Sequence, residues 1–385
     1  MLYGAAIVSC LALVRGVPFS FDPSPVYVGA LVYLAIPGSV VAFTTYLTVV
    51  HRLGPERAAY MTVLFPVVAL TISVFFEDYR VTPLAGVGLA AILLGTVLAY
   101  ATHATLDMTL LAVVPDRGWP MAASAALMTL GLAIKTALFP FHAWLPPAHA
   151  GAPAPASAML SALVPKASFV ILLRLWFDVV PDLAGPLLLL VLAGLGGAAV
   201  IYGSLLAIGQ DRLKLIIAYS TVAQLGYLFL VFPLAGGGGA AQPWAAGVWT
   251  GAAFHAFAHA LAKAAMFLCA GQFLRAVGHD RLEGLRGLAG TMPIACFAFG
   301  LSAVVLMGLP PSGGFTAKYL MLTAAFASGQ LLWAAVLVGG GLLAAIYLFR
   351  PLNMMFSKRG ADGTALSPVP RAEQTLPLVL ALAAV

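Results

Sequence analysis

Val248–Phe273 has the sequence VWTGAAFHAFAHALAKAAMFLCAGQF, an apolar stretch that contains Lys263 with His259 four residues and His255 eight residues before it. At 3.6 residues per turn, these offsets place the three side chains on one stripe of a helix. A lysine within the hydrocarbon of a bilayer costs from roughly 2.5 to more than 10 kcal/mol, depending on the reference state. Such a residue is typical of proton or ion transport.

The composition of the whole chain indicates a membrane protein. Of the 385 residues, 62% are hydrophobic and 8% are charged, and the mean hydropathy is +1.02. Soluble domains contain about 25% charged residues. We therefore predict an all-α polytopic membrane protein with about 12–13 transmembrane helices, because each span needs about 20 apolar residues. The expected helices lie near residues 1–14, 26–50, 58–76, 82–103, 119–139, 153–178, 183–208, 213–234, 244–275, 288–309, 314–328, 331–349 and 375–385.

The net charge of +6 does not indicate a nucleic-acid partner, because the basic residues lie in short segments between apolar stretches. Short loops rich in Lys and Arg mark the cytoplasmic side of a membrane. The basic residues form four clusters: His51–Arg57, Asp211–Lys214, Arg275–Arg286 and Arg350–Arg371. If 288–328 is one interrupted span, the last three of these clusters lie on the same face of the membrane.

Prolines interrupt two of the apolar stretches close to a lysine. Lys135 lies five residues before Pro140, and Lys318 lies seven residues after the Pro310–Pro311 pair. Proline removes a backbone hydrogen bond and clashes with the preceding turn, so both helices should be discontinuous. Backbone groups freed at membrane depth need partners from protein or water. One lysine precedes its break and the other follows, as in inverted repeats whose broken helices frame a pathway at the midplane.

Other polar side chains in the apolar stretches are candidates for the same pathway. His255 and His259 suit a relay, because imidazole titrates near neutral pH and can accept on one nitrogen while it donates from the other. His142 and His149 flank the first break, where they either cap freed backbone groups or conduct protons. The helix after Asp211 carries accessory candidates that either hold water or pack across helices: Ser220, Thr221, Gln224 and Tyr227.

Metal binding is the competing interpretation of two histidines four residues apart. We expect no metal, because no third ligand lies nearby in the sequence and Lys263 would repel a cation. Cys10, Cys269 and Cys296 lack paired spacing, so we expect neither a disulfide nor a metal site from them. Without a cysteine cluster, a haem motif or GxGxxG after a strand, we expect no cofactor.

Four motifs follow one another after residue 119. They are KTALFPFHAWLPPAHAGAPAPASAML (135–160), DRLKLIIAYSTVAQLGY (211–227), HAFAHALAKAAMFLCAG (255–271) and GLPPSGGFTAKYLML (308–322). Together they resemble the proton-conducting antiporter-like subunits of respiratory complex I, membrane-bound hydrogenases and Mrp-type sodium/proton antiporters. The resemblance covers about residues 119–385.

This resemblance implies a relay in which Lys135, and Lys166 thirty-one residues later, act with the other intramembrane groups. In the family, the lysine corresponding to Lys135 pairs with a glutamate on an earlier helix, and that glutamate has no counterpart here. Either a carboxylate at a helix end folds inward, or Lys135 lacks its usual partner, which we favour. The carboxylates in question are Glu56, Glu77, Asp78, Asp107 and Asp116. Pro165 directly before Lys166 departs from the family pattern.

Residues 1–103 resemble the last part of an EamA-type drug/metabolite transporter. Leu53, Gly54 and Ala58 form its LGxxxA turn, Glu77 ends a span, and a glycine-spaced final span follows with Gly86, Gly88 and Gly95. We expect a junction at 104–118. The antiporter-like domain would then cover 119–385 and be incomplete at both ends, in a fused or truncated reading frame.

We therefore expect a non-redox subunit that moves protons across the membrane, with other membrane subunits of a respiratory or antiporter complex as partners. Whether sodium is exchanged, and whether that complex is a redox translocase, stays open. The expected location is a prokaryotic inner membrane. The alternatives are an EamA-type small-molecule exporter and a non-functional fused fragment. The relay groups should face the bundle interior at comparable depth: Lys135, Lys166, His255, His259, Lys263 and Lys318.

Overall fold

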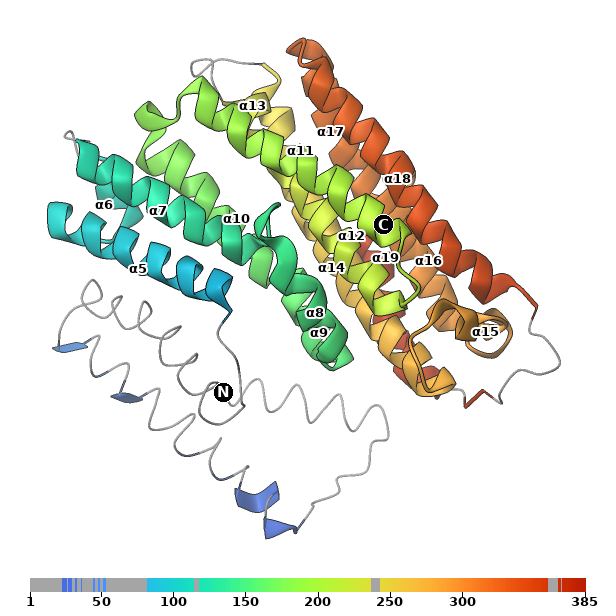
Figure 1. Cartoon of the computed structure of the whole chain (residues 1–385). Coiled ribbons are helices and arrows are strands. Elements are labelled where there is room, and N and C mark those ends of the chain that lie inside the picture. Colours follow the sequence, from blue (N-terminus) through green and yellow to red (C-terminus); the bar gives the residue numbers. More distant parts are fainter. Residues whose placement is uncertain are drawn as a thin grey trace. The chain divides into compact units, whose positions relative to one another are not determined.

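The computed structural model describes residues 82–113, 118–236, 243–358, 366–367 and 369–385, together with scattered positions between residues 23 and 52. The chain divides into two units (Figure 1). The first comprises Met1–Arg80 with Thr105–Asp107, and the second comprises Val81–Ala104 with Met108–Val385. The helices expected near 1–14, 26–50 and 58–76 lie wholly or largely outside the described residues. The account below concerns the second unit.

The described residues form helices and no β-strand, which confirms the all-α fold class. The helices are α5 (Pro83–His103), α6 (Met108–Ala112), α7 (Trp119–Thr136), α8 (Leu145–Gly151), α9 (Ala154–Ala162), α10 (Val164–Arg174), α11 (Pro186–Ile208), α12 (Leu213–Leu228), α13 (Val231–Ala235), α14 (Ala245–Val277), α15 (Leu288–Thr291), α16 (Pro293–Met307), α17 (Gly313–Ala327), α18 (Leu331–Phe356) and α19 (Arg371–Ala384).

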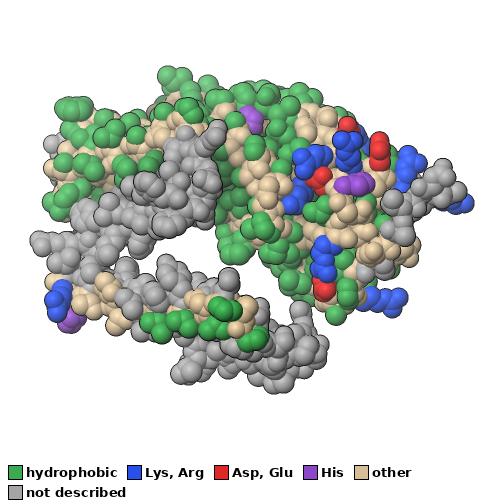
Figure 2. Space-filling view, turned by 60° about the horizontal axis from the view of Figure 1, so that its bottom comes forward, with side chains coloured by type: hydrophobic (Ala, Val, Ile, Leu, Met, Phe, Trp, Pro, Cys, Tyr) green, Lys and Arg blue, Asp and Glu red, His purple; other side chains and the backbone are tan. Residues whose placement is uncertain are grey.

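Six helical segments in the described part of the chain are long and apolar enough to cross a membrane, and a seventh is added if a bent pair counts as one span. The chain is an integral membrane protein. Its flanks are mainly hydrophobic, whereas charged side chains gather at one end of this unit (Figure 2). The six segments are Pro83–His103, Ala154–Val179, Pro186–Ile208, Leu213–Ala235, Ala245–Val277 and Leu331–Phe356.

Ion pairs at the charged end join the basic clusters that the sequence predicts on one face. Arg350 bonds Asp211 at 3.1 Å, and Arg212 bonds Asp280 at 3.0 Å. These two pairs connect segments from three of the clusters, which confirms that they share a face.

The α12 helix is the centre of the bundle. Of its 16 residues, 14 are buried, against five of the 21 residues of α5. Glycines let α11 approach it closely: a Cβ built on Gly196 would lie 2.6 Å from the carbonyl oxygen of Gly226, and one on Gly203 would lie 2.8 Å from the backbone nitrogen of Ala223. Small residues at such crossings let helix backbones pack tightly in membranes. α12 is therefore fixed in position by backbone contact.

The first predicted break is present. α7 ends at Thr136, Ala137 adopts the left-handed conformation with φ 58°, and the axis bends by 42° between α7 and the Phe141–Gly151 segment. The indole nitrogen of Trp144 donates to the carbonyl of Ile134 at 2.8 Å. The Ile134 carbonyl also accepts the backbone N–H of Ala137 at 3.0 Å, so this carbonyl at the end of α7 is paired within the protein, as membrane depth requires.

The second predicted break separates α16 from α17. α16 ends at Met307 and is followed by Gly308, whose φ is 79°, and the Ser312 hydroxyl accepts the backbone N–H of Phe315 at the start of α17. The two helices pack along successive parts of α14: α16 lies beside its second half, and α17 beside its first half. The single interrupted span over 288–328 stays a prediction. The pseudo-two-fold relation between the two breaks stays a prediction.

α5 packs on α7 within this unit. The Ser124 hydroxyl of α7 donates to the carbonyl of Gly95 at 2.6 Å, and Gly88 lies against the Ile134 side chain. Gly88 and Gly95 thus allow the close packing expected from sequence, with α7 as the neighbour, whereas a Cβ on Gly86 would meet nothing within 4 Å. The boundary at 104–118 stays a prediction.

The close approach of α11 to α12 predicts a strong effect of a single methyl group. Gly196→Ala should lower the free energy of unfolding by about 1–3 kcal/mol, because the added methyl overpacks a backbone contact. Gly194→Ala on the same helix is the control, since a Cβ there meets nothing within 4 Å. Thermal unfolding in detergent measures both. Equal stability of the two variants would contradict this packing.

Candidate functional site

Four of the described lysines are buried. Lys214, at the start of α12, is 5% exposed and donates to the carbonyl of Ala152 at 2.7 Å; the other three lie deeper in the helical bundle. Lys166 on α10, Lys263 on α14 and Lys318 on α17 have exposed fractions of 8%, 0% and 9%. Among the described residues, the side chains that form ion pairs lie near helix ends, and none of these pairs includes a buried lysine. The three ammonium groups are held by hydrogen-bond acceptors instead.

Lys263 reaches across to α12. Its Nζ donates to the carbonyl of Ile217 at 2.9 Å and to the hydroxyl of Ser220. The Ser220 hydroxyl in turn donates to the same Ile217 carbonyl at 2.8 Å. One turn of α12 therefore provides two acceptors for a fully buried ammonium group.

The same carbonyl connects Lys263 with Lys166. Lys166 Nζ donates to the carbonyl of Ser161 at 2.5 Å, and the Ser161 hydroxyl bonds the Thr221 hydroxyl at 3.0 Å. Thr221 donates to the Ile217 carbonyl, also at 3.0 Å. Two lysines 97 residues apart in the sequence are thus linked through adjacent polar groups of α9 and α12.

The two histidines of α14 continue the line away from Lys263. The rings of His255 and His259 stack with centroids 5.8 Å apart and planes 10° apart. His255 Nε2 bonds the backbone carbonyl of Gln224 at 2.9 Å, whereas both ring nitrogens of His259 are buried without a partner. Lys166, Lys263 and His255 all lie within electrostatic range of His259.

Lys318 ends the line at the second break. Its Nζ donates to the carbonyls of Leu306 and Met307 at 3.0 Å each, and lies 4.7 Å from the ring centre of Tyr227. Gln224 Nε2 donates to the same Leu306 carbonyl at 2.9 Å. These carbonyls belong to the last turn of α16, where the helix dipole favours a cation. The break thus supplies the acceptors that hold Lys318.

α12 carries the groups that connect all three lysines. Ser220, Gln224 and Tyr227, predicted as accessory residues, face this line and are at most 1% exposed. Sequence reasoning missed Ser161 and the carbonyls of Ile217 and Leu306. A backbone carbonyl has no residue-type signature, and Ser161 lies in an apolar helix with no charged neighbour to draw attention to it.

Lys135 does not lie in this interior. It is exposed on the last turn of α7, between the buried Ile134 and Thr136. Neighbouring positions on a helix point about 100° apart, and α5 and α10 pack on other faces of α7. The expectation that Lys135 faces the bundle interior is not met in this chain, while its role in the relay stays a prediction.

The histidines of the first break differ in their surroundings. His149 is fully buried and stacks on Phe267 of α14 at 4.5 Å, with neither ring nitrogen paired. His142 is 8% exposed and packs edge-on against Tyr202 at 5.1 Å. His149 lies within electrostatic range of Lys166 and Lys263. It is therefore the better placed of the two for contact with the buried line.

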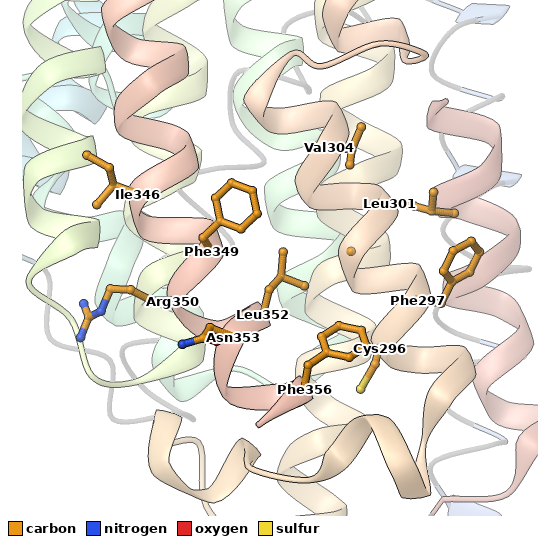
Figure 3. A pocket seen from close by; sticks show the side chains of 11 residues that line it. Cys296, Phe297, Leu301, Val304, Ile346, Phe349, Arg350, Leu352, Asn353 and Phe356 are labelled. Carbon is orange, nitrogen blue, oxygen red and sulfur yellow. The ribbon is translucent and has the colours of Figure 1, made fainter. Parts of the chain in front are cut away.

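Two cavities lie beside α18. A groove of about 820 Å³ between α16 and α18 is lined mainly by apolar side chains, with Arg350 and Asn353 at one end (Figure 3). A smaller cavity of about 250 Å³ is lined by Lys318 and Gly308 next to the second break. The groove contains no member of the lysine line. No group of three potential metal-ligating side chains occurs within the described ranges.

Comparison with known proteins assigns the family. The model of the family described as "NADH:quinone oxidoreductase/Mrp antiporter, TM" matches residues 79–344, which include α5 to α17. The chain belongs to this family. The model of the EamA-like transporter family matches residues 1–101, so the two matches overlap over α5.

The similar proteins are subunits of membrane complexes. NADH-quinone oxidoreductase subunit N of Desulforudis audaxviator is 37% identical over 271 residues, covering 69% of this chain and 52% of that protein. A chain of the Mrp complex from Dietzia sp. matches with a TM-score of 0.68 and 26% identity, covering 78% of this chain and 62% of its own. A chain of the membrane-bound sulfane sulfur reductase, an archaeal respiratory membrane complex, matches with a TM-score of 0.67 and 28% identity. The match covers 78% of this chain and 60% of that chain. The chain thus spans about half to two thirds of these relatives.

A glycine beside Tyr227 provides a test of this geometry. A Cβ on Gly340 of α18 would collide with the Tyr227 hydroxyl, whereas one on Gly339 meets nothing within 4 Å. Gly340→Ala should displace Tyr227 from Lys318 and lower stability by about 1–3 kcal/mol, with Gly339→Ala as the control. Thermal unfolding and tyrosine fluorescence measure the two effects. A Gly340 variant indistinguishable from the Gly339 variant would show that α18 does not approach Tyr227 as described.

Proposed function

We propose that this chain moves protons in a prokaryotic cell membrane along Lys166, Lys263, His259, His255 and Lys318, as a membrane subunit of a larger complex. The observation that carries the proposal is the line of buried titratable groups. In it, Lys166 bonds the Ser161 carbonyl, and the Ser161 hydroxyl connects through Thr221 to the Ile217 carbonyl that holds Lys263. The proposed complex is an NADH:quinone oxidoreductase-type, hydrogenase or cation/proton antiporter assembly. Family membership and the names of the relatives support this part of the proposal.

The chemistry follows from burial. Low dielectric surroundings disfavour a charged lysine, and nearby acceptors favour it, so small changes around a buried ammonium shift its protonation. Each lysine here has neutral oxygen acceptors and no described carboxylate partner. A proton added at one end of the line would therefore repel those further along, which is how a charge moves between neighbouring sites.

The histidines bridge the longest section between lysines. A neutral imidazole can take a proton on one nitrogen and release one from the other. Both nitrogens of His259 are free of protein partners and lie next to Lys263 on α14. Buried polar atoms of this kind are usually paired with water. Lys263 and His259 are thus the proposed centre of the route.

Lys135 is proposed to act outside this buried section. It is exposed beside the first break, where a carboxylate from another segment or subunit can reach it. His142 and His149 belong to the segment that follows the break. His149, which stacks on Phe267 of α14, is proposed to connect the break with the buried line. The identity of the exchanged ion, whether proton alone or sodium as well, depends on the assembled complex.

The central test replaces Lys263 by alanine and by arginine in the full chain reconstituted into liposomes. Lys263→Ala should lower potential-driven proton uptake by roughly a hundredfold, the usual scale for loss of a proton-transfer group. Lys263→Arg should fail as well, because arginine does not release its proton at accessible pH.

The matched controls are Lys358→Ala and Lys358→Arg, at an exposed lysine after α18. Uptake is normalised to folded protein. Normal uptake in the arginine variant would remove Lys263 from the relay. Small-molecule transport that survives both Lys263 variants, with no proton uptake by the unmodified chain, would favour the EamA-type exporter instead.

The side-chain bridge between Lys166 and Lys263 is tested by Thr221→Val, which removes one hydroxyl and keeps the shape. Uptake should fall by about three- to tenfold, the scale of one lost hydrogen bond. Thr323→Val is the control, because Thr323 is exposed and bonds only within its own helix. If the two valine variants conduct equally, the Ser161–Thr221 bridge has no part in transport.

A further inference from the structure

The smaller cavity, of about 250 Å³, lies between α17 and α18 and reaches the ammonium group of Lys318. The two helices lie side by side (Figure 1). Apart from Lys318, the lining consists of glycine, apolar and aromatic residues from α17, from α18 and from the second break. The cavity therefore combines one cationic group with walls that offer no charged partner.

The outer wall of this cavity faces the bilayer. Tyr319 of α17 and Val338 and Leu342 of α18 line it, and each of these side chains is at least half exposed. α18 is one of the six segments that are long and apolar enough to cross the membrane. At that position in a membrane protein, exposed apolar side chains contact lipid hydrocarbon. A ligand therefore reaches the cavity from the membrane.

A glycine forms the inner wall beside the ammonium group. A Cβ on Gly341 of α18 would lie 3.8 Å from Lys318 Nζ and 3.3 Å from the carbonyl oxygen of Met307. Because Gly341 has no side chain, nothing projects from this position of α18 into the space next to the ammonium group. The inner end of the cavity is thus open to a group that can pair with Lys318.

Lys318 keeps a hydrogen-bond donor for such a group. Its Nζ donates to the carbonyls of Leu306 and Met307, which uses two of the three N–H groups of an ammonium. None of the ion pairs among the described residues includes Lys318. Buried charges are normally paired with an opposite charge. The site therefore lacks an anion, and its apolar walls favour an anion that carries a hydrocarbon chain.

We propose that this cavity binds a free fatty acid from the bilayer, with its carboxylate bonded to Lys318 Nζ and its alkyl chain between α17 and α18. The cavity is smaller than the roughly 300–1,000 Å³ of pockets that enclose a whole drug-sized ligand. It has room for the carboxyl group and the first methylene groups, and the rest of the chain extends past Tyr319 and Leu342 into the lipid. This binding does not depend on the proposed transport of protons.

The protonation chemistry favours a fatty acid over a phospholipid. A carboxylic acid titrates at about pH 4–5, so a neutral fraction can pass the apolar outer wall, whereas a phosphodiester stays charged. At the inner end, the carboxyl O–H bond breaks as its proton joins the neutral amine of Lys318. A carboxylate and an ammonium result, so that atoms and charge balance and no other reactant is needed.

Photolabelling of the full chain in phosphatidylcholine nanodiscs tests the proposal. The probes are palmitic acid with a diazirine in its chain and the alcohol with the same chain and diazirine, and mass spectrometry locates the label. The acid should label α17 and α18 about tenfold more than the alcohol, the scale of a charge-assisted hydrogen bond. Equal labelling by the acid and the alcohol would overturn the proposal.

Two variants locate the site. Gly341→Leu should lower labelling by the acid to that of the alcohol, because the leucine side chain occupies the inner end of the cavity. Gly339→Leu is the matched control, since Gly339 does not line the cavity and a Cβ there meets nothing within 4 Å. Lys318→Met, which keeps an unbranched side chain without the ammonium group, should also remove the difference between acid and alcohol. Labelling is normalised to folded protein from size-exclusion chromatography.

Competition identifies the source of the ligand. Unlabelled palmitate should displace the labelled acid, and phosphatidylglycerol at the same concentration should not. Equal displacement by phosphatidylglycerol would assign the cavity to a phospholipid and overturn the proposal. Acid labelling that is the same in Gly341→Leu and Gly339→Leu, or that persists in Lys318→Met, would also overturn it. None of these readouts measures proton uptake, so their failure is distinct from failure of the proposed function.

Discussion

A buried ammonium group must be surrounded by acceptors, and this constraint explains how the bundle is arranged. Each of Lys166, Lys263 and Lys318 donates to at least one backbone carbonyl of another helix or of a helix end. An unpaired charge at that depth would cost several kcal/mol. Carbonyl groups in a regular helix are already used within the helix. The fold therefore supplies acceptors where helices end, break or cross closely.

The broken helices are the main source of these acceptors. At the end of α16, the carbonyls of Leu306 and Met307 no longer accept bonds from a continuing helix and turn to Lys318. At the end of α9, the Ser161 carbonyl has the same role for Lys166. A proline or a left-handed residue near each break ends the helix locally, and a lysine uses what the break exposes. Each of these helix ends thus supplies the acceptors that its buried lysine needs.

α12 converts separate lysine sites into one line. Gly196 and Gly203 of α11, with Gly226 of α12, bring the two helices together, which leaves the other face of α12 to α14, α18 and the second break. On that face, the Ser220 hydroxyl bonds Lys263, the backbone carbonyl of Gln224 bonds His255, and the Tyr227 ring lies beside Lys318. The helix carries few strongly polar groups, and its hydroxyl and amide side chains are placed at the points where the other helices present their charges.

Much of this could be predicted from sequence, and the remainder has identifiable causes. The stripe of His255, His259 and Lys263 follows from helical periodicity, and both breaks follow from proline chemistry. The exposure of Lys135 was not foreseen, because a lysine well inside an apolar stretch does not reveal which neighbours cover it. The cavity at Lys318 was missed, since Gly341 in an apolar helix carries no signal until Lys318 is placed beside it.

The central claim is that a continuous polar route joins the buried lysines. A cryo-electron microscopy map of the full chain in lipid nanodiscs, at a resolution that shows ordered water, tests it most directly. The account predicts water density within about 2.7–3.2 Å of the His259 ring nitrogens, on the line from Lys263 to His255. Density that shows His259 enclosed by apolar atoms, with no water between Lys263 and Lys318, would contradict it.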